Sequence, residues 1–260
     1  MIVVTGCRRS GTSLWMQMLA AADLPIVGQK FSEELEVLAE ANPKGFYESV
    51  HRYGVQGDPA DLAGCVLKMF VPGVIEADEE DLERVILTLR PWREHVVSAA
   101  AFEKLESAAL GPDVPQAMPA DLEWWFENYC LLSDFSDRDY PMMVVAYDLL
   151  LEKPRETAER ALVYLDADPA KADVMAAAVD PALRRADPAR ATSELPPEVL
   201  ETFDALYARV RGREAFDDAF VDRLGETHET LMPLIAPYLE GEDDWIEAEL
   251  DEDLEAGDEA

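Results

Sequence analysis

Short runs of apolar, mostly β-branched residues alternate along the chain with longer stretches in which apolar positions recur every three or four residues. The apolar runs cover residues 2–5, 65–71, 85–89 and 142–147. Short runs that are apolar throughout are typical of parallel strands buried on both faces. Because long helical stretches separate them, the pattern predicts an α/β fold with a central parallel sheet covered by helices on both faces.

Helices are expected after the first, third and fourth strands and throughout the C-terminal part of the chain. Pro154 suits the first turn of a helix, where its missing N–H would have no partner. One domain is expected over residues 1–239, because a chain of this length can bury a full core without dividing. The expected helices cover 11–22, 92–105, 121–135, 154–165, 197–211 and 216–238.

Charge narrows the possible partners. The chain has 55 acidic and 22 basic residues, a formal net charge of -33 at pH 7, which excludes bare nucleic acid and anionic membranes as expected partners. Part of the acidity lies in residues 240–260, which contain no basic residue and little apolar content, so we predict a solvated, disordered tail. Because the rest of the chain is also strongly acidic, we hypothesise a halophilic protein adapted to a salt-rich cytoplasm.

The apolar segments and the cysteines indicate where in the cell the protein is located. Apolar segments are too short or too interrupted to span a bilayer, and the chain starts directly in a strand-like run, so we expect a soluble, cytoplasmic protein. Three scattered cysteines, at positions 7, 65 and 130, suit neither a disulfide framework nor a zinc site and indicate buried thiols in a reducing compartment.

The segment between the first strand and the first helix carries the strongest chemical signal. Gly6 and Gly11 are spaced as in the phosphate-binding loop G-x-x-x-x-G-K-[ST], but Thr12 stands where the lysine belongs. Glycines let the backbone approach an oxyanion, and the helix start directs free N–H groups toward it. The cation must then come from Arg8 or Arg9. The alternative is a purely structural role, a glycine turn before a helix.

Cysteine-based phosphate chemistry is disfavoured at this loop. A tyrosine-phosphatase loop also wraps an anion with backbone N–H groups, but it needs an arginine six positions after its cysteine. The residue six positions after Cys7 is Ser13.

The stretch Arg9-Ser10-Gly11-Thr12-Ser13 resembles the first loop of sulfotransferases that use 3'-phosphoadenosine 5'-phosphosulfate (PAPS), which has the form [RK]-S-G-T-[ST]. That family has a second mark, an arginine at the end of a later strand and a serine eight positions on, which grip the 3'-phosphate. Arg90 and Ser98 stand at this spacing. The chain departs from the family in having Pro91 directly after the arginine. The resemblance implies a P-loop-like three-layer α/β/α fold.

Two further stretches are similar to the family. Residues 42–48, NPKGFYE, match its NPKG[YF]xE stretch, and residues 145–150, followed by Pro154, match its Y-E-x-L then Pro segment. The resemblance extends to about residue 168. Beyond it, Arg184 and Arg185 can close over the nucleotide, and a solvent-exposed role is an equal alternative for both.

The resemblance implies a function, that of a PAPS-dependent sulfotransferase. PAPS is then the donor and 3'-phosphoadenosine 5'-phosphate (PAP) the product, with no metal required. Arg9 and the loop hydroxyls are expected to hold the 5'-phosphosulfate, where negative charge develops on the bridging oxygen. Lys68 lies in an apolar run, where a charge is costly unless it points toward an anion. We expect it to act on the transferring sulfuryl group.

This chain lacks the general base of the best-known family members. They have a catalytic histidine at the position where this chain has Phe70. An alcohol or phenol acceptor must lose a proton, so a base is required. Glu48, in the matched loop, is the replacement candidate, and His51 is the second. The alternative for Glu48 is a salt bridge to Lys44 or Arg52.

Several other residues are expected to have roles outside the proposed chemistry. His95 is expected to have a surface role in the first turn of its helix. Trp124 and Trp125 are expected not to face inward together, so one of them is available for an acceptor or partner. Asp148 is expected to fix a backbone group or a helix start.

Two rival functions stay open at this point. The first is a P-loop kinase or nucleotide hydrolase with a degenerate loop, in which Asp148 is the nearest available acidic Mg²⁺ ligand. The second is a nucleotide-binding protein without catalysis. The acceptor is expected to be a small molecule or a glycan, and the sequence specifies neither it nor the oligomeric state.

Overall fold

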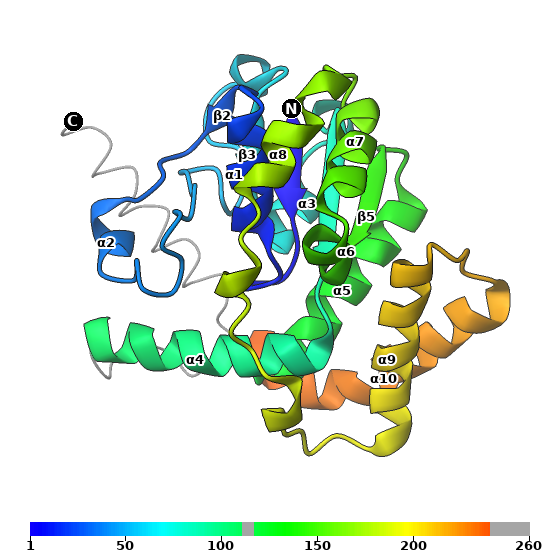
Figure 1. Cartoon of the computed structure of the whole chain (residues 1–260). Helices are drawn as coiled ribbons and strands as arrows, with labels where there is room; N and C mark the ends of the chain where they lie inside the picture. The colour runs from blue at the N-terminus through cyan, green and yellow to red at the C-terminus, as the bar shows by residue number, and fades with distance from the viewer. Residues whose placement is uncertain (111–116, 240–260) are drawn as a thin grey trace.

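The computed structural model describes residues 1–110 and 117–239 (Figure 1). The expected acidic tail, 240–260, and residues 111–116 lie outside the described residues. A five-stranded parallel sheet forms the centre of the described part, with the strand order β2-β3-β1-β4-β5. The strands are β1 (Ile2–Thr5), β2 (Ile26–Val27), β3 (Val66–Lys68), β4 (Arg84–Leu89) and β5 (Met142–Ala146).

The four predicted strands are confirmed, and a fifth is added. Strand β2 was missed because two residues are too short to show a hydrophobic period. The run at 65–71 is strand only as far as Lys68, because the chain then turns into helix α3 (Val71–Glu76), which has a proline in its first turn.

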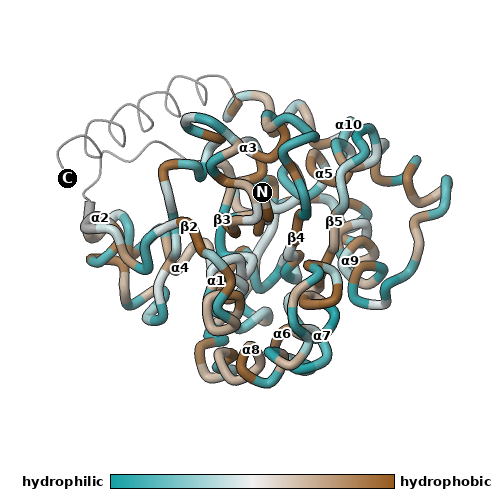
Figure 2. The backbone as a smooth tube through the Cα atoms, turned by 90° about the horizontal axis from the view of Figure 1, so that it is seen from above, coloured by the Kyte–Doolittle hydropathy of each residue, from teal (hydrophilic) through white to brown (hydrophobic). Residues whose placement is uncertain are grey.

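Helices cover both faces of the sheet because successive strand side chains point in opposite directions. Ile2 and Val4 pack on one face with α1 (Thr12–Ala21), whereas Val3 packs on the other with α5 (Ala120–Asp137). Figure 2, the view from above, shows the strands in a row with helices on either side. The α/β class with a central parallel sheet is therefore confirmed. The first face carries α1, α6 (Tyr147–Glu152), α7 (Pro154–Tyr164) and α8 (Ala172–Ala178); the second carries α3, α4 (Trp92–Leu110), α5 (Ala120–Asp137), α9 (Pro197–Gly212) and α10 (Asp218–Leu239).

The predicted helices agree with the structure to within a few residues at their ends, but the expectation for the adjacent tryptophans is wrong. Trp124 and Trp125 are both fully buried. Helix α5 is enclosed on two sides, so its inward-facing arc is wide enough for both rings. The ring of Phe203, on α9, lies 5.1 Å from Trp124 and 5.0 Å from Trp125 between centroids.

Short helical turns make most of the remaining connections. They include α2 (Glu33–Glu36), η1 (Pro59–Leu62), η2 (Glu79–Asp81), η3 (Pro169–Lys171), η4 (Pro181–Leu183) and η5 (Pro188–Arg190). The segment that carries η4 and η5 runs from α8 past α4 to α9 (Figure 1). None of the helices in the described ranges is long and apolar enough to cross a membrane.

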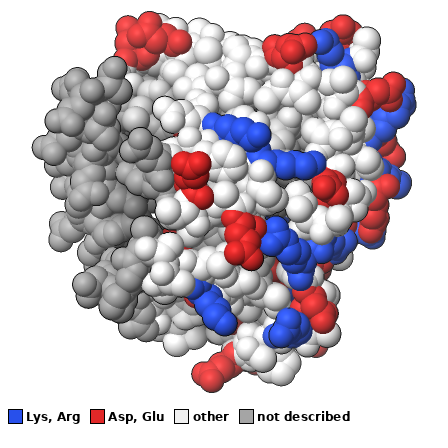
Figure 3. All heavy atoms as spheres, turned by 60° about the vertical axis from the view of Figure 1, so that its left-hand side comes forward, with Lys and Arg blue, Asp and Glu red and all other residues white. Residues whose placement is uncertain are grey.

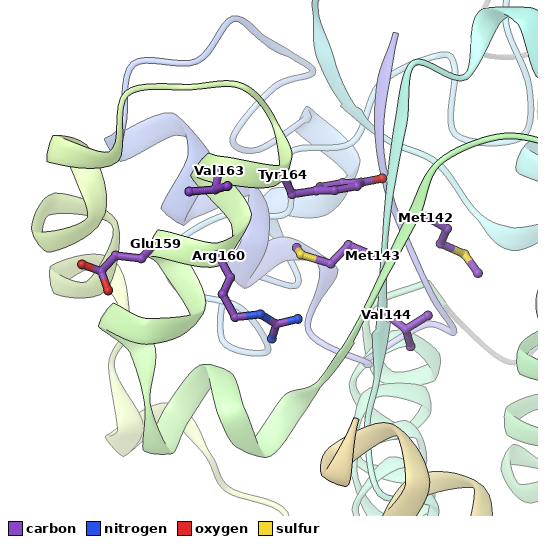
Figure 4. A pocket seen from close by; sticks show the side chains of 7 residues that line it. All are labelled: Met142, Met143, Val144, Glu159, Arg160, Val163 and Tyr164. Atoms are coloured by element: carbon purple, nitrogen blue, oxygen red, sulfur yellow. The ribbon is translucent and has the colours of Figure 1, made fainter. Parts of the chain in front are cut away.

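A groove lies at the free edge of the sheet, between β5 and α7. It has a volume of about 590 Å³ and includes Met142, Val144 and Arg160 among its lining residues. In Figure 4, Arg160 points from α7 toward the strand. The strand residues of the groove are the first three of β5, whereas the residues singled out by the sequence follow the carboxyl ends of strands. This groove is therefore separate from the site described below.

Candidate functional site

The loop between β1 and α1 depends on two glycines. Gly6 has φ 140° and Gly11 has φ 112°, values that favour glycine. A Cβ on Gly6 would lie 2.6 Å from the carbonyl oxygen of Thr88, and a Cβ on Gly11 would lie 2.7 Å from the ring of Tyr147. The loop is thus pressed against the carboxyl end of β4 and the start of α6, and no other residue fits at either position without displacement.

The start of α1 presents unused hydrogen-bond donors. Gly11 caps the helix without a side chain, and the first turn holds no acidic residue. The hydroxyl of Ser10 is buried and has no partner in the described part of the chain. Ser13 Oγ, in contrast, donates to the carbonyl oxygen of Phe46 at 3.2 Å. Free N–H groups at a helix start, with a buried hydroxyl beside them, can bind an anion.

Arg9 is the cation of this loop. It adopts the left-handed conformation, with φ 66°, and its Nη2 donates to the carbonyl oxygen of Ala41 at 3.1 Å. No carboxylate among the described residues forms an ion pair with it, and its buried Nε has no partner there. Burial and the neighbouring charges of Arg90 and Arg8 lower the pKa of Arg9 to about 10. A buried cation surrounded by cations is a site that attracts an anion.

Arg90 reaches the same point from the end of β4. Its Nη1 donates to the carbonyl oxygen of Arg9 at 2.8 Å, and its guanidinium lies 4.7 Å from the ring centroid of Tyr147. Its Nε is also buried without a partner in the described chain. Ser98 is half-buried on α4, two turns along the helix that follows Arg90.

Lys68 and Glu48 form a pair at the end of β3. Lys68 is buried, and its Nζ donates to Glu48 Oε1 at 2.7 Å and to the carbonyl oxygen of Phe46 at 3.1 Å. Burial lowers the pKa of Lys68, an effect that Glu48 opposes. Lys44, one of the partners considered for Glu48, donates instead to the carbonyl oxygen of Ala178 at 2.8 Å. The pair places an acid–base group and an ammonium group side by side.

His51, the second candidate base, has one ring nitrogen occupied. Its Nδ1 accepts a hydrogen bond from the backbone N–H of Gln56 at 3.1 Å. The neutral ring then carries its proton on Nε2 and has no free lone pair for an acceptor proton. Burial lowers the pKa of His51. One ring nitrogen of His51 is therefore already engaged, as is one carboxylate oxygen of Glu48.

The two arginines beyond the matched region approach the site from the segment around η4. Arg185 donates to the carbonyl oxygen of Glu40 at 3.0 Å, and its charge is one of those that lower the pKa of Arg9. Arg184 is held by carboxylates, since it bonds to Glu94 and donates to Asp148 Oδ1 at 2.9 Å. The expectation that Asp148 fixes a backbone group or helix start is therefore corrected, because its carboxylate binds a guanidinium.

Arg8 turns toward acidic side chains on α4 and α5. Its guanidinium lies 3.7 Å from carboxylate oxygens of both Glu106 and Glu123. The second oxygen of Glu123 lies 3.6 Å from Nε2 of His95. Burial raises the pKa of Glu123, but His95 and Arg8 together lower it by more than burial raises it. The pKa of Glu123 therefore lies below its ordinary value. This network anchors the loop to the helices behind it.

The surface role expected for His95 is wrong. Its side chain is fully buried, because α5 packs against the first turns of α4. The signal was present in the sequence: Trp92, His95, Val96 and Ala99 fall at helical spacing on one face, and the other three are apolar.

Two residues at the site received no direct role from sequence reasoning. Tyr147 packs its ring against Gly11 and beneath Arg90, and Glu94 is buried between Arg90 and Arg184. Tyr147 falls within a matched stretch, and Glu94 stands one helical turn after Arg90, so spacing was the available signal. On the face shown in Figure 3, lysine and arginine side chains gather near the centre among acidic ones, although the chain is acidic overall.

Comparisons of the sequence with known protein families and with curated proteins found no match.

Proposed function

We propose that this protein is a sulfotransferase that transfers a sulfuryl group from PAPS to a hydroxyl or amine acceptor. The observation that carries the proposal is the hydrogen bond from Arg90 to the backbone of Arg9 at a glycine loop. The guanidinium of Arg9 has no carboxylate partner in the described chain. A P-loop-like organisation is part of the proposal. The strand order β2-β3-β1-β4-β5 and the loop between β1 and α1 support it.

The loop supplies the donor site in this proposal. Arg9, the free N–H groups at the start of α1 and the hydroxyls of Ser10 and Thr12 hold the 5'-phosphosulfate. Arg90 and Ser98 hold the 3'-phosphate. The planar guanidinium groups suit forked contacts with phosphate oxygens.

Lys68 and Glu48 supply the chemistry. The acceptor oxygen attacks sulfur in line and gives its proton to Glu48, while the bond between sulfur and the bridging oxygen breaks. The bridging oxygen leaves with the electron pair as part of PAP, and Arg9 and Lys68 stabilise its negative charge. The products are the sulfated acceptor and PAP, with the proton on Glu48, so charge and atoms balance.

The contacts of Asp148 favour this reaction over phosphoryl transfer. A kinase or nucleotide hydrolase needs an acidic ligand for Mg²⁺. Asp148, the acid nearest to that role in the sequence, faces Arg184 at 2.9 Å and Arg211 at 3.6 Å. Its carboxylate is thus already neutralised by two guanidinium groups.

A cytoplasmic, high-salt setting belongs to the same proposal. All three cysteines are free thiols in the structure, as a reducing compartment allows. The charge of -33 suits a salt-rich cytoplasm, where screening limits repulsion between carboxylates.

Turnover tests the proposed function. The protein is incubated in high salt with PAPS labelled in the sulfuryl group and a panel of small alcohols, phenols, amines and glycans. We expect label to move to at least one acceptor class with stoichiometric formation of PAP, and Arg9→Gln to abolish the transfer. Tight binding of PAP without transfer to any acceptor would instead support a nucleotide-binding protein without catalysis.

A further inference from the structure

Glu94 is a buried carboxylate held between two arginines. It lies in the first turn of α4, and only 2% of the residue is exposed. Its Oε2 lies 3.5 Å from Nη2 of Arg90 and accepts a hydrogen bond from Nε of Arg184 at 3.2 Å. Arg184 also bonds to the other oxygen of the same carboxylate. Both oxygens of Glu94 are therefore directed at guanidinium groups.

These contacts divide the site into two electrostatic ends. At one end, Glu94 pairs with Arg90 and Arg184, and Asp148 pairs with Arg184 and Arg211, so each of these arginines has a carboxylate partner. At the other end, Arg9 has no carboxylate partner within the described ranges, and burial and neighbouring cations lower its pKa. An incoming anion therefore meets uncompensated charge at Arg9 and neutralised charge at Arg90.

We propose that Glu94 is a specificity-determining residue that weakens the binding of a second anionic group beside Arg90. The inference rests on the proposed function, because it concerns the nucleotide that binds there. A phosphate beside Arg90 is repelled by the Glu94 carboxylate and must compete with it for both arginines. A free ribose hydroxyl, in contrast, can donate a hydrogen bond to the same carboxylate, as acidic residues do in other nucleotide sites.

The consequence is a narrow preference between nucleotides. PAP binds only somewhat more tightly than adenosine 5'-phosphate, because Glu94 offsets the charge that Arg90 and Arg184 would otherwise offer to the 3'-phosphate. This limits how tightly the product is held after transfer, while the 5' end stays anchored by Arg9. Glu94 thus weakens binding of the 3'-phosphate and makes the release of PAP easier.

The ratio of two dissociation constants tests this inference. PAP and adenosine 5'-phosphate are titrated calorimetrically into the full chain, as wild type and as Glu94→Gln, which removes the charge and keeps an oxygen for the arginines. We expect the preference for PAP to rise about tenfold in the variant, the size expected for one neighbouring charge in a partly screened site. Glu106→Gln, which removes the same charge beside Arg8, is the matched control and should change both affinities alike.

A second variant covers the case in which Glu94→Gln does not fold. Arg184→Gln leaves Glu94 with one guanidinium partner fewer, so the preference for PAP should fall instead of rise. An unchanged ratio in the folded variants, with PAP still bound by the wild type, would overturn the role of Glu94 and leave the proposed function standing. Failure of the wild type to bind either nucleotide would overturn both.

Discussion

Arg90 donates a hydrogen bond from Nη1 to the carbonyl oxygen of Arg9 at 2.8 Å. This contact joins the end of β4 to the glycine loop after β1, two places 81 residues apart in the sequence. It brings the guanidinium of Arg90 to the backbone of Arg9, and the charge of Arg90 is one of the causes that lower the pKa of Arg9. An anion that binds at this loop would offset the repulsion between the two cations.

Replacing Arg9 should stabilise the protein while removing its function. The pKa of Arg9 is lowered to about 10 from an ordinary value near 12.5, so the folded state binds this proton less tightly than the unfolded state. At neutral pH the charge therefore costs stability, and the cost disappears only as the pH rises through the folded value. Arg9→Gln should raise the midpoint of thermal unfolding by about 3 °C in low-salt buffer without sulfate or phosphate.

The control for this variant is Arg190→Gln, which removes the same charge from an exposed position and should leave the midpoint unchanged. Millimolar sulfate should raise the midpoint of the wild type and have no effect on Arg9→Gln, since the binding cation is gone. A lower midpoint for Arg9→Gln than for the wild type in anion-free buffer would contradict this account.

Glu48 and His51 should differ sharply in their effect on turnover. Glu48→Gln should lower kcat by about 10²- to 10⁴-fold, the usual contribution of a general base, because the amide cannot accept the proton. The amide oxygen can still accept the hydrogen bond from Lys68, so PAP should bind as before. The matched variant His51→Gln should retain most of the activity, because Nδ1 of His51 is already engaged by Gln56.

Single-turnover measurements with PAPS separate these effects from binding. If Glu48→Gln retained normal turnover with intact nucleotide binding, the assignment of the base to Glu48 would have to be abandoned. Loss of activity in His51→Gln alone would transfer the assignment to His51.

The buried network behind the loop should appear as acid sensitivity. The pKa of Glu123 lies below its ordinary value of 4.5, since His95 and Arg8 outweigh the effect of burial. A carboxylate with a lowered pKa adds stability above its ordinary pKa and loses it as the pH falls through the folded value. The free energy of unfolding of Glu123→Gln should therefore be about 1 kcal/mol lower than that of the wild type at pH 7, and this difference should shrink steadily below pH 4.5.

Urea unfolding at a series of pH values measures this difference. Glu201→Gln, at an exposed position on α9, serves as the control and should show no comparable difference. A gap between Glu123→Gln and the wild type that widened toward low pH would contradict the assigned direction of the pKa shift.

Salt should stabilise the fold. With 55 acidic and 22 basic residues, repulsion between carboxylates opposes the compact state, and raising the salt from about 0.1 M to about 1 M shortens the Debye length from about 10 Å to about 3 Å. The midpoint of thermal unfolding should rise with KCl over this range. A midpoint that falls as KCl is added would rule out adaptation to high salt.

Local pattern predicted the parts of the fold and site that depend on neighbouring residues. The four predicted strands, the six long helices and the glycine loop follow from hydrophobic period and from the conformations that Gly6 and Gly11 allow. Burial of His95 was also readable from helical spacing, although the charged neighbour Glu94 obscured it. Trp125 could not be placed in this way, because its burial depends on a helix formed by residues 197–212.

The contacts on which the proposed chemistry depends could not be predicted from local pattern. Arg184 meets Glu94 across 90 residues, and Lys68 meets Glu48 across 20. Each pair forms only because the fold brings together segments that are far apart in the sequence. The spacing to Ser98 indicated Arg90, and a charge within an apolar run indicated Lys68, but neither signal could show that Arg9 has no carboxylate partner in the described structure.

Calorimetric titration with PAP in the absence of metal, compared with ATP in the presence of Mg²⁺, shows which nucleotide the loop between β1 and α1 prefers. We expect the wild type to bind PAP without metal and more tightly than ATP with Mg²⁺, and Arg9→Gln to lose this binding while remaining folded. Tighter binding of ATP with Mg²⁺, or binding of PAP that is unchanged in Arg9→Gln, would contradict this expectation.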